Sequence, residues 1–252
     1  MDVKLMIERY DREVRRRPQE GPGAVVEREP GIVRVVNAAD GWSGVTWCGL
    51  DGLDAGAVIA AQVRRFAEAG VPWEWKHYSH DRPADLPARL LAAGFEPGPP
   101  EALLVAETGA VPQGVELPDA VHLVPVTTAA EAGLLVRVHD EVFGGDHAGI
   151  GRQLLASPGT VSGVVALAGE RPICAARVEF HAGTGFASLW GGGTVPDWRG
   201  RGVFRAVVAY RAALAAAAGY RYLQVDASAD SSPILQRLGF TQLAVTIPFV
   251  HA

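Results

Sequence analysis

The chain has few cysteines and no long apolar run. Its 252 residues include two cysteines, Cys48 and Cys174, too few for a disulfide framework or a zinc site, so both are expected to be buried free thiols. No segment approaches the roughly 20 apolar residues of a membrane helix. The charged N-terminal stretch MDVKLMIERYDREVRRR has no apolar signal core. These absences predict a cytoplasmic protein with no membrane partner.

Lysine is also scarce, and the 28 acidic residues outnumber the 23 basic ones. Lysine occurs only at Lys4 and Lys76, and the formal net charge is −5. A net negative charge argues against a generic nucleic-acid surface, so no nucleic-acid partner is expected. The apolar content of 48% is ample for a packed core, and the length suits one large domain or two small ones.

One segment divides the chain into halves. The stretch TGAVPQGVELPD, residues 108–119, is rich in Pro and Gly and lacks hydrophobic periodicity, which is typical of a linker. The flanking segments, 1–107 and 120–252, each have the size of a small domain.

Hydrophobic periodicity predicts a similar order of elements in the two halves. In the first half we expect helices over 3–17, 54–69 and 83–93, and strands over 24–29, 31–37, 44–50, 72–79 and 101–107. In the second half we expect helices over 128–143, 148–156, 202–218 and 231–239, and strands over 122–126, 161–168, 172–181, 184–195, 221–227 and 241–250. The stretches RLLAAGFEPGPPEALLV (89–105) and LQRLGFTQLAVTIPFV (235–250) both read helix, Gly-Phe, strand. We interpret this as an internal repeat of one α+β unit.

The stretch PDWRGRGVFRAVVAYR, residues 196–211, carries the clearest chemical signal. Its glycines let the backbone approach a ligand, and the helix that follows leaves its first N–H groups without intrahelical partners. The amides of residues 201–204 can form an anion-binding nest, to which Arg199 and Arg201 add positive charge, so a diphosphate is the natural ligand. The chain has no GxxxxGK[ST] motif, and Arg205 stands where a dinucleotide fingerprint needs its third glycine.

The stretch VPDWRGRGVF, residues 195–204, resembles the acetyl-CoA loop of the GCN5-related N-acetyltransferases (GNAT), which reads [QR]-x-x-G-x-[GA]. Arg199 and Gly202 fit that pattern, while Phe204 stands where Gly or Ala is usual. Since the family's loop contacts are mainly backbone amides, we expect Phe204 to alter the fit without abolishing binding. The segments RYLQVDA and SSPILQRLGF follow in the family's order.

The resemblance implies an α+β fold of two tandem GNAT-like domains, each a mixed, mostly antiparallel twisted sheet flanked by helices. It covers the second half well and reaches the first half only through the repeat. The GLDGLDAG segment of the first half (49–56) has glycines and aspartates but no basic residue, which makes it a poor seat for a diphosphate. We therefore expect one cofactor site, in the second half, and a degenerate structural first half.

The resemblance also implies the residues that bind the co-substrate acetyl-CoA; no metal is expected. The strand before the loop would carry the pantetheine and thioester, at Gly193, Thr194 and Val195 with Gly192 before them, and the diphosphate would lie on the loop. The turn after the next strand would help to hold the CoA arm, although Ser231 is equally a candidate helix N-cap. The expected cofactor-binding residues are Gly193, Thr194, Val195, Arg199, Gly200, Arg201, Gly202, Val203, Phe204, Ser228 and Ser231.

The catalytic groups are less evident. The family's usual general acid is a tyrosine four positions before the glycine of Leu-Gly-Phe, and here that position is Leu235. Alternation over 172–181 places Arg177, Glu179 and His181 on one strand face, so Glu179 is the first candidate for a general base, unless that face is simply solvated. Asp226 is expected near the cleft. Residues 139–141 lie where the family shapes its acceptor pocket, unless they form a solvated helix end.

These inferences favour an N-acetyltransferase that moves an acetyl group from acetyl-CoA to a primary amine of a small molecule. A protein or peptide N-acetyltransferase is the alternative enzyme. A non-catalytic acyl-CoA sensor module is the alternative outside enzymes, and a scaffold that has lost the cofactor is a third reading. The chain is expected to act as a monomer or a homodimer.

Overall fold

The contacts within the chain define two units. The computed structural model describes residues 1–21, 23–37 and 41–251. The first unit comprises Met1–Leu103, Asp226–Ser232 and Gln242–Ala252, and the second comprises Leu104–Val225 and Pro233–Thr241. This division differs from the boundaries expected at 108–119, because the C-terminal strand groups with the first unit and the Pro- and Gly-rich segment lies inside the second.

The first unit is a sheet with the strand order β1-β2-β3-β4-β12. Its pairs are antiparallel except for β3 with β4. Its elements are α1 (Val3–Tyr10), the π-helical turn η1 (Asp11–Arg15), β1 (Ala24–Glu29), β2 (Ile32–Asn37), β3 (Gly44–Cys48), α2 (Ala55–Ala69), β4 (Trp73–Tyr78), α3 (Leu86–Ala92), β5 (Glu96–Pro97) and β12 (Thr241–His251).

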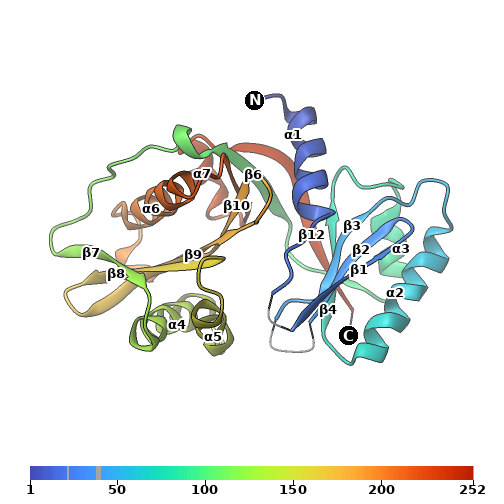
Figure 1. Cartoon of the computed structure of the whole chain (residues 1–252), viewed down its shortest axis with the longest axis horizontal. Coiled ribbons are helices and arrows are strands. Elements are labelled where there is room, and N and C mark those ends of the chain that lie inside the picture. Colours follow the sequence, from blue (N-terminus) through green and yellow to red (C-terminus); the bar gives the residue numbers. More distant parts are fainter. Residues whose placement is uncertain (22, 38–40, 252) are drawn as a thin grey trace. The chain divides into compact units, whose positions relative to one another are not determined.

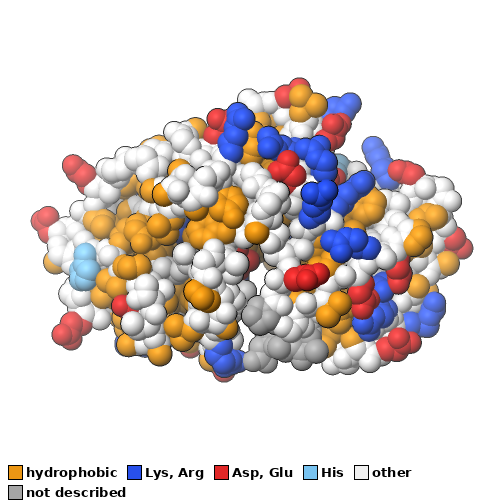
Figure 2. Space-filling model, in the orientation of Figure 1, with side chains coloured by type: hydrophobic (Ala, Val, Ile, Leu, Met, Phe, Trp, Pro, Cys, Tyr) orange, Lys and Arg blue, Asp and Glu red, His pale blue; other side chains and the backbone are white. Residues whose placement is uncertain are grey.

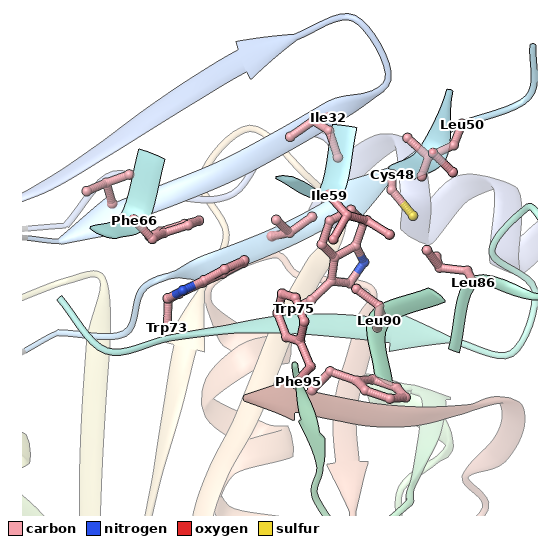
Figure 3. Packing of buried hydrophobic residues seen from close by; sticks show 14 residues of the cluster. Ile32, Cys48, Leu50, Ile59, Phe66, Trp73, Trp75, Leu86, Leu90 and Phe95 are labelled. Atoms are coloured by element: carbon pink, nitrogen blue, oxygen red, sulfur yellow. The ribbon is translucent and has the colours of Figure 1, made fainter. Parts of the chain in front are cut away.

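An aromatic core joins α2 and α3 to this sheet (Figure 3). Trp75 of β4 is fully buried, with Ile59 of α2 and Leu90 of α3 in the same cluster. Trp73 stacks on Phe66 with ring centroids 4.2 Å apart. Since burying one side chain of this size stabilises a fold by roughly 1.5–3 kcal/mol, this cluster contributes a large share of the stability of the first unit.

The second unit has the strand order β7-β8-β9-β10-β11-β6. Helices α4 and α5 cover one face of its sheet and α6 covers the other (Figure 1). Its elements are β6 (Glu101–Glu107), η2 (Thr108–Ala110), β7 (Val121–Val126), α4 (Ala129–Phe143), α5 (Ala148–Ala156), β8 (Val161–Ala168), β9 (Arg171–Phe180), β10 (Phe186–Thr194), η3 (Pro196–Trp198), α6 (Val203–Ala217), β11 (Tyr222–Ala227) and α7 (Ser232–Arg237).

The predicted internal repeat is visible in both units. Each unit contains a parallel strand pair, β3 with β4 or β10 with β11, and each of these pairs is joined by a crossover helix, α2 or α6. The helix that follows ends in the same way in both. Gly94 and Gly239 have φ of 90° and 93°, and the amides of Phe95 and Phe240 donate to the carbonyls five residues earlier, at 3.1 and 3.2 Å.

The two cysteines and the lengths of the helices bear on the expectations drawn from the composition. Cys48 and Cys174 are free and buried, as predicted, and burial raises the pKa of Cys174 to about 11. Of the helices formed by the described residues, none combines the length and the apolar character that crossing a membrane requires.

Candidate functional site

The glycine-arginine loop connects β10 to α6 in the second unit. The amide of Val195 still donates to the carbonyl of Ile173 at 2.9 Å, and η3 follows. Gly200 and Gly202 then have φ of 76° and 87°, a conformation that glycine adopts without strain. Gly202 is the N-cap of α6 and offers no side chain to cap the helix. The first amides of α6 are therefore directed at the loop without a side-chain acceptor.

Two arginines lie exposed on this loop. Arg199 donates through Nε to the carbonyl of Thr194 at 3.0 Å, and the Arg201 guanidinium lies 4.7 Å from the centroid of the Trp198 ring. Within the part of the chain that the structure describes, neither arginine has a carboxylate within 4.0 Å. Their positive charges are therefore available to an anion on the loop, as is the dipole of the 15-residue helix α6.

The corresponding helix in the first unit begins differently. The Asp54 carboxylate caps α2 by accepting a 3.1 Å hydrogen bond from the amide of Ala57. A carboxylate thus lies at the helix end where α6 leaves its amides open, and it repels a further anion. This contrast agrees with the expectation that the GLDGLDAG segment (49–56) binds a diphosphate poorly.

A β-bulge interrupts β10 just before the loop. The register with β9 shifts between Trp190 and Gly193, and Gly191 has φ of 59°. The parallel ladder with β11 has already ended at the pair Ser188 and Gln224, although both strands continue. The expected pantetheine segment therefore begins just after the bulge, where pairing with β9 resumes at Gly193 and Thr194 and the ladder with β11 has ended.

Helices on both faces leave no room for side chains at the bulge. A Cβ atom at Gly191 would lie 2.8 Å from Cε1 of His139, and one at Gly193 would lie 2.9 Å from Cγ1 of Val142. On the opposite face, a Cβ atom at Gly192 would lie 2.9 Å from Cε2 of Phe204. These close approaches explain why three consecutive glycines occupy this stretch.

The bulge is held by hydrogen bonds from both helices. From α4, Nε2 of His139 lies 2.8 Å from the carbonyl oxygen of Gly191, and because a carbonyl only accepts, Nε2 carries the proton. From α6, Arg211 donates through Nη1 to the carbonyls of Arg177 at 3.0 Å and Trp190 at 3.5 Å. Nδ1 of His139 is buried and has no hydrogen-bond partner among the described residues.

The buried state of His139 predicts a loss of stability in acid. Burial, with a contribution from the nearby Arg177, lowers the pKa of His139 to about 4. In the unfolded chain histidine titrates near its ordinary value, so between about pH 6.5 and pH 4 the unfolded state binds a proton that the folded state does not, and stability falls as the pH falls. The full loss is about 3 kcal/mol. Urea unfolding measured from pH 7.5 to pH 4.5 should show this loss of stability. In His139→Gln the free energy of unfolding should depend less on pH over this range; an unchanged dependence in the variant would show that His139 is not its cause.

The candidate base lies on a polar strand face, as alternation predicts. Arg177, Glu179 and His181 are half-buried, and Nε of Arg177 donates to Oε1 of Glu179 at 2.8 Å. The other oxygen of Glu179 has no hydrogen-bond partner within the described ranges. Next to it, Nε2 of His181 lies 2.5 Å from Oγ of Ser188, which donates to Oε1 of Gln224 at 2.6 Å. The face is therefore an ordered polar network rather than a fully solvated surface.

The remaining residues named for the site belong to β11, the turn that follows it and α7. Ser228 and Ser231 are grouped with the first unit, and their hydroxyl oxygens are 3.2 Å apart in the turn before α7. Asp226, expected near the cleft, forms a 2.7 Å ion pair with Lys76 of β4. Leu235, at the position of the family's usual tyrosine, is buried and belongs to the core.

Arg15 occupies the point in the first unit where the parallel strands separate. The ladder of β3 and β4 ends at Val45 and Trp75, and Arg15 donates through Nε to the next carbonyl of β3, that of Thr46, at 3.0 Å. Nη2 of Arg15 holds both oxygens of Asp81 at 2.8 and 3.0 Å. Lys and Arg side chains gather on the visible face around α1 (Figure 2), but Arg15 is only 2% exposed.

The sequence analysis does not identify His139 and Arg211 as the two side chains that hold the bulge. It placed His139 at a helix end near an acceptor pocket, and it did not consider Arg211. Both stand on apolar stripes of their helices: His139 follows the buried Leu135 by four residues, and Arg211 follows the buried Val207 by four. A polar residue in register with a core stripe is the available signal.

Comparison with known proteins gives the class of fold. No family model and no curated protein sequence matches the chain. Among solved structures, a GCN5-related N-acetyltransferase from Kribbella flavida is similar with a TM-score of 0.71 and 18% identity, over 99% of this chain and 93% of that one. A tandem GNAT protein from the clavulanic acid biosynthesis pathway is similar with a TM-score of 0.62 and 13% identity, over 92% and 84%. A GCN5-related N-acetyltransferase from Sphaerobacter thermophilus has a TM-score of 0.60 and 13% identity, over 89% and 81%.

These similarities span nearly the whole chain and confirm the predicted fold class, α+β with two GNAT-like units in tandem. At 13–18% identity the similarity concerns the fold, and the activity has to be argued from the site.

Proposed function

We propose that the chain is an N-acetyltransferase that moves an acetyl group from acetyl-CoA to a primary amine of a small molecule. The observation that carries the proposal is the arrangement of the loop around Gly200 and Gly202, where exposed arginines and open helix amides follow directly on a glycine bulge. The loop fits a diphosphate, and the stretch from Gly193 to Val195 fits an extended pantetheine arm.

The proposed reaction needs one proton acceptor and one set of donors to the acyl oxygen. The amine nitrogen attacks the acetyl carbon, the carbonyl electron pair moves onto oxygen, and its return breaks the C–S bond with the electron pair leaving on sulfur. We keep Glu179 as the candidate base because one of its oxygens is held by Arg177 while the other is open to a water or an amine. The leaving thiolate needs no tyrosine, since a thiolate is a weak base, which accommodates Leu235.

Calorimetric titration with acetyl-CoA tests this proposal. Arg199→Ala should weaken binding by about 10- to 100-fold, the value of a charge-assisted hydrogen bond to phosphate. Gly202→Asp should weaken it further, because a carboxylate would face the open amides of α6. Gly183→Asp is the matched control: Gly183 also has a positive φ, of 74°, but lies in the turn before β10. The proposal would be contradicted if the wild type and the three variants bound acetyl-CoA with equal affinity, or if the wild type did not bind it.

A non-catalytic acyl-CoA-binding module is the second candidate. It is favoured by the buried Leu235 at the usual tyrosine position and by the ion pair that engages Glu179. Such a module would bind acetyl-CoA and respond to the loop variants in the same way, but it would release no CoA thiol with any amine. Turnover with a panel of small primary amines and with peptides separates the two functions and also distinguishes a small-molecule from a protein acceptor.

A further inference from the structure

Arg211 is a buried cation surrounded by backbone carbonyls. Its side chain extends from α6 and is 2% exposed. Nε donates to the carbonyl of Val207 at 3.2 Å, and Nη1 donates to the carbonyls of Arg177 and Trp190. Among the residues that the structure describes, no carboxylate lies within 4.0 Å of its guanidinium. Every acceptor around Arg211 is therefore a neutral backbone carbonyl.

This arrangement is costly for the fold. A buried charge destabilises a protein unless an opposite charge or strong hydrogen bonds compensate it. Burial lowers the pKa of Arg211 to about 10, with Cys174 opposing the shift and Arg177 adding to it. The neighbours on the stripe, Val203 and Val207, are apolar, so a leucine or methionine would complete the core at position 211 without that penalty. The cost implies that the guanidinium has a role other than packing.

The guanidinium is placed at the start of the bulge. Arg177 and Trp190 are the last regular pair between β9 and β10 before the register shifts, and Nη1 reaches the carbonyls of both. Nη2 lies 3.4 Å from the position that a Cβ atom of Gly192 would take. No partner for Nη2 occurs in the described parts of the chain. A positive charge with an unused donor therefore lies directly behind the glycine bulge.

We propose that Arg211 is a positioning residue for acyl transfer, which fixes the bulge through the carbonyls of Arg177 and Trp190 and places a positive charge behind its amides, so that those amides polarise the acetyl carbonyl. This inference rests on the proposed function. The charge that develops on the acyl oxygen during attack is negative, and a fixed positive charge in a site of low dielectric stabilises it without reorganisation. His139 holds the same bulge from the opposite face, but it is neutral and supplies only orientation.

The test is a vibrational spectrum of acetyl-CoA labelled with ¹³C at the acetyl carbonyl. The frequency of the carbonyl stretch depends on how strongly the carbonyl is polarised, and the measurement requires no known acceptor. In the wild type we expect the bound carbonyl stretch to move to lower frequency than that of free acetyl-CoA. In Arg211→Gln most of this displacement should disappear, while Arg211→Lys, which keeps the charge but cannot hold two carbonyls, should retain part of it. Arg137→Gln, at an exposed position on α4, should behave as the wild type.

Each outcome decides between polarisation and packing. A displacement in Arg211→Gln equal to that of the wild type, or no displacement in the wild type complex, overturns the inference even if acetyl-CoA binds. Failure of the wild type to bind acetyl-CoA overturns the proposed function itself and is recognised by the absence of any bound signal. If Arg211→Gln does not fold, Arg211→Lys is compared with the wild type instead. A frequency displacement in Arg211→Lys equal to that of the wild type would then contradict the role of the carbonyl contacts. With any amine that is turned over, kcat of Arg211→Gln should fall by about 10- to 100-fold with a smaller change in KM.

Discussion

Replacing Arg15 by methionine should destabilise the first unit by about 3–5 kcal/mol, because it leaves a buried carboxylate without its partner. The Asp81 side chain is 2% exposed and receives two hydrogen bonds from Arg15 and one from the amide of Tyr78. Burial opposes the charge on Arg15, but the carboxylates of Asp81 and Asp11 outweigh this effect and raise the pKa of Arg15. Urea unfolding followed by tryptophan fluorescence measures the loss.

The chain offers a close control for Arg15→Met. Arg12 lies on the same turn, η1, but its side chain is 62% exposed and pairs with the neighbouring Glu13 at 3.2 Å. Arg12→Met should therefore change stability by less than about 1 kcal/mol. The double variant Arg15→Met with Asp81→Asn should recover part of the loss, because no uncompensated charge remains. Equal effects of Arg12→Met and Arg15→Met would show that the buried network is not what holds the strand ends of this unit.

Local pattern predicts most elements of both units, although β5 is not among the expected strands and the helix expected over 3–17 is α1 followed by η1. The stripe of Val203, Val207, Tyr210 and Leu214 predicts a helix over 202–218, and α6 spans Val203–Ala217. The strand expected at 161–168 is β8. Such features depend on residues a few positions apart, and glycines such as Gly70 and Gly219, with positive φ, end the helices where the sequence indicates.

Long-range pairing could not be predicted in the same way. The C-terminal strand was expected to complete the second half, yet β12 pairs with β4, for example through Phe249 and Trp75. Nothing in the alternation of β12 specifies which strand edge it joins. The insertion of Arg15 between Thr46 and Asp81 is equally invisible in the sequence, because these partners lie 31 and 66 positions further along the chain.

The candidate site shows the same division. The loop and the glycines were recognised from consecutive residues, because glycine and arginine at a helix start report on backbone geometry and charge. The two side chains that hold the bulge, His139 and Arg211, come from helices on opposite faces of the sheet. Each donates a hydrogen bond to a backbone carbonyl of β10. Their partners are backbone carbonyls, which carry no sequence signal.

Replacing Gly191 by valine should be the most damaging change at the bulge. A β-branched residue at φ of 59° costs about 1–2 kcal/mol, and forcing a side chain against the fully buried His139 costs about 1–3 kcal/mol more. Because relief of this clash would move the bulge, acetyl-CoA affinity should also fall by about tenfold or more, equivalent to one or two lost hydrogen bonds. Unfolding and calorimetric titration of the same preparation measure both effects.

Gly183→Val separates the two causes. Gly183 has φ of 74° and no atom within 4 Å of the position that a Cβ would take, so valine there meets the backbone strain without the clash. The difference between the two variants is therefore the contribution of the packed bulge. A large difference in both stability and affinity would mean that the close approach of α4 to β10 maintains the ligand-binding geometry. If both variants lose the same stability and bind acetyl-CoA equally well, the glycines at the bulge serve only backbone conformation, and the proposed thioester position along this strand has to be abandoned.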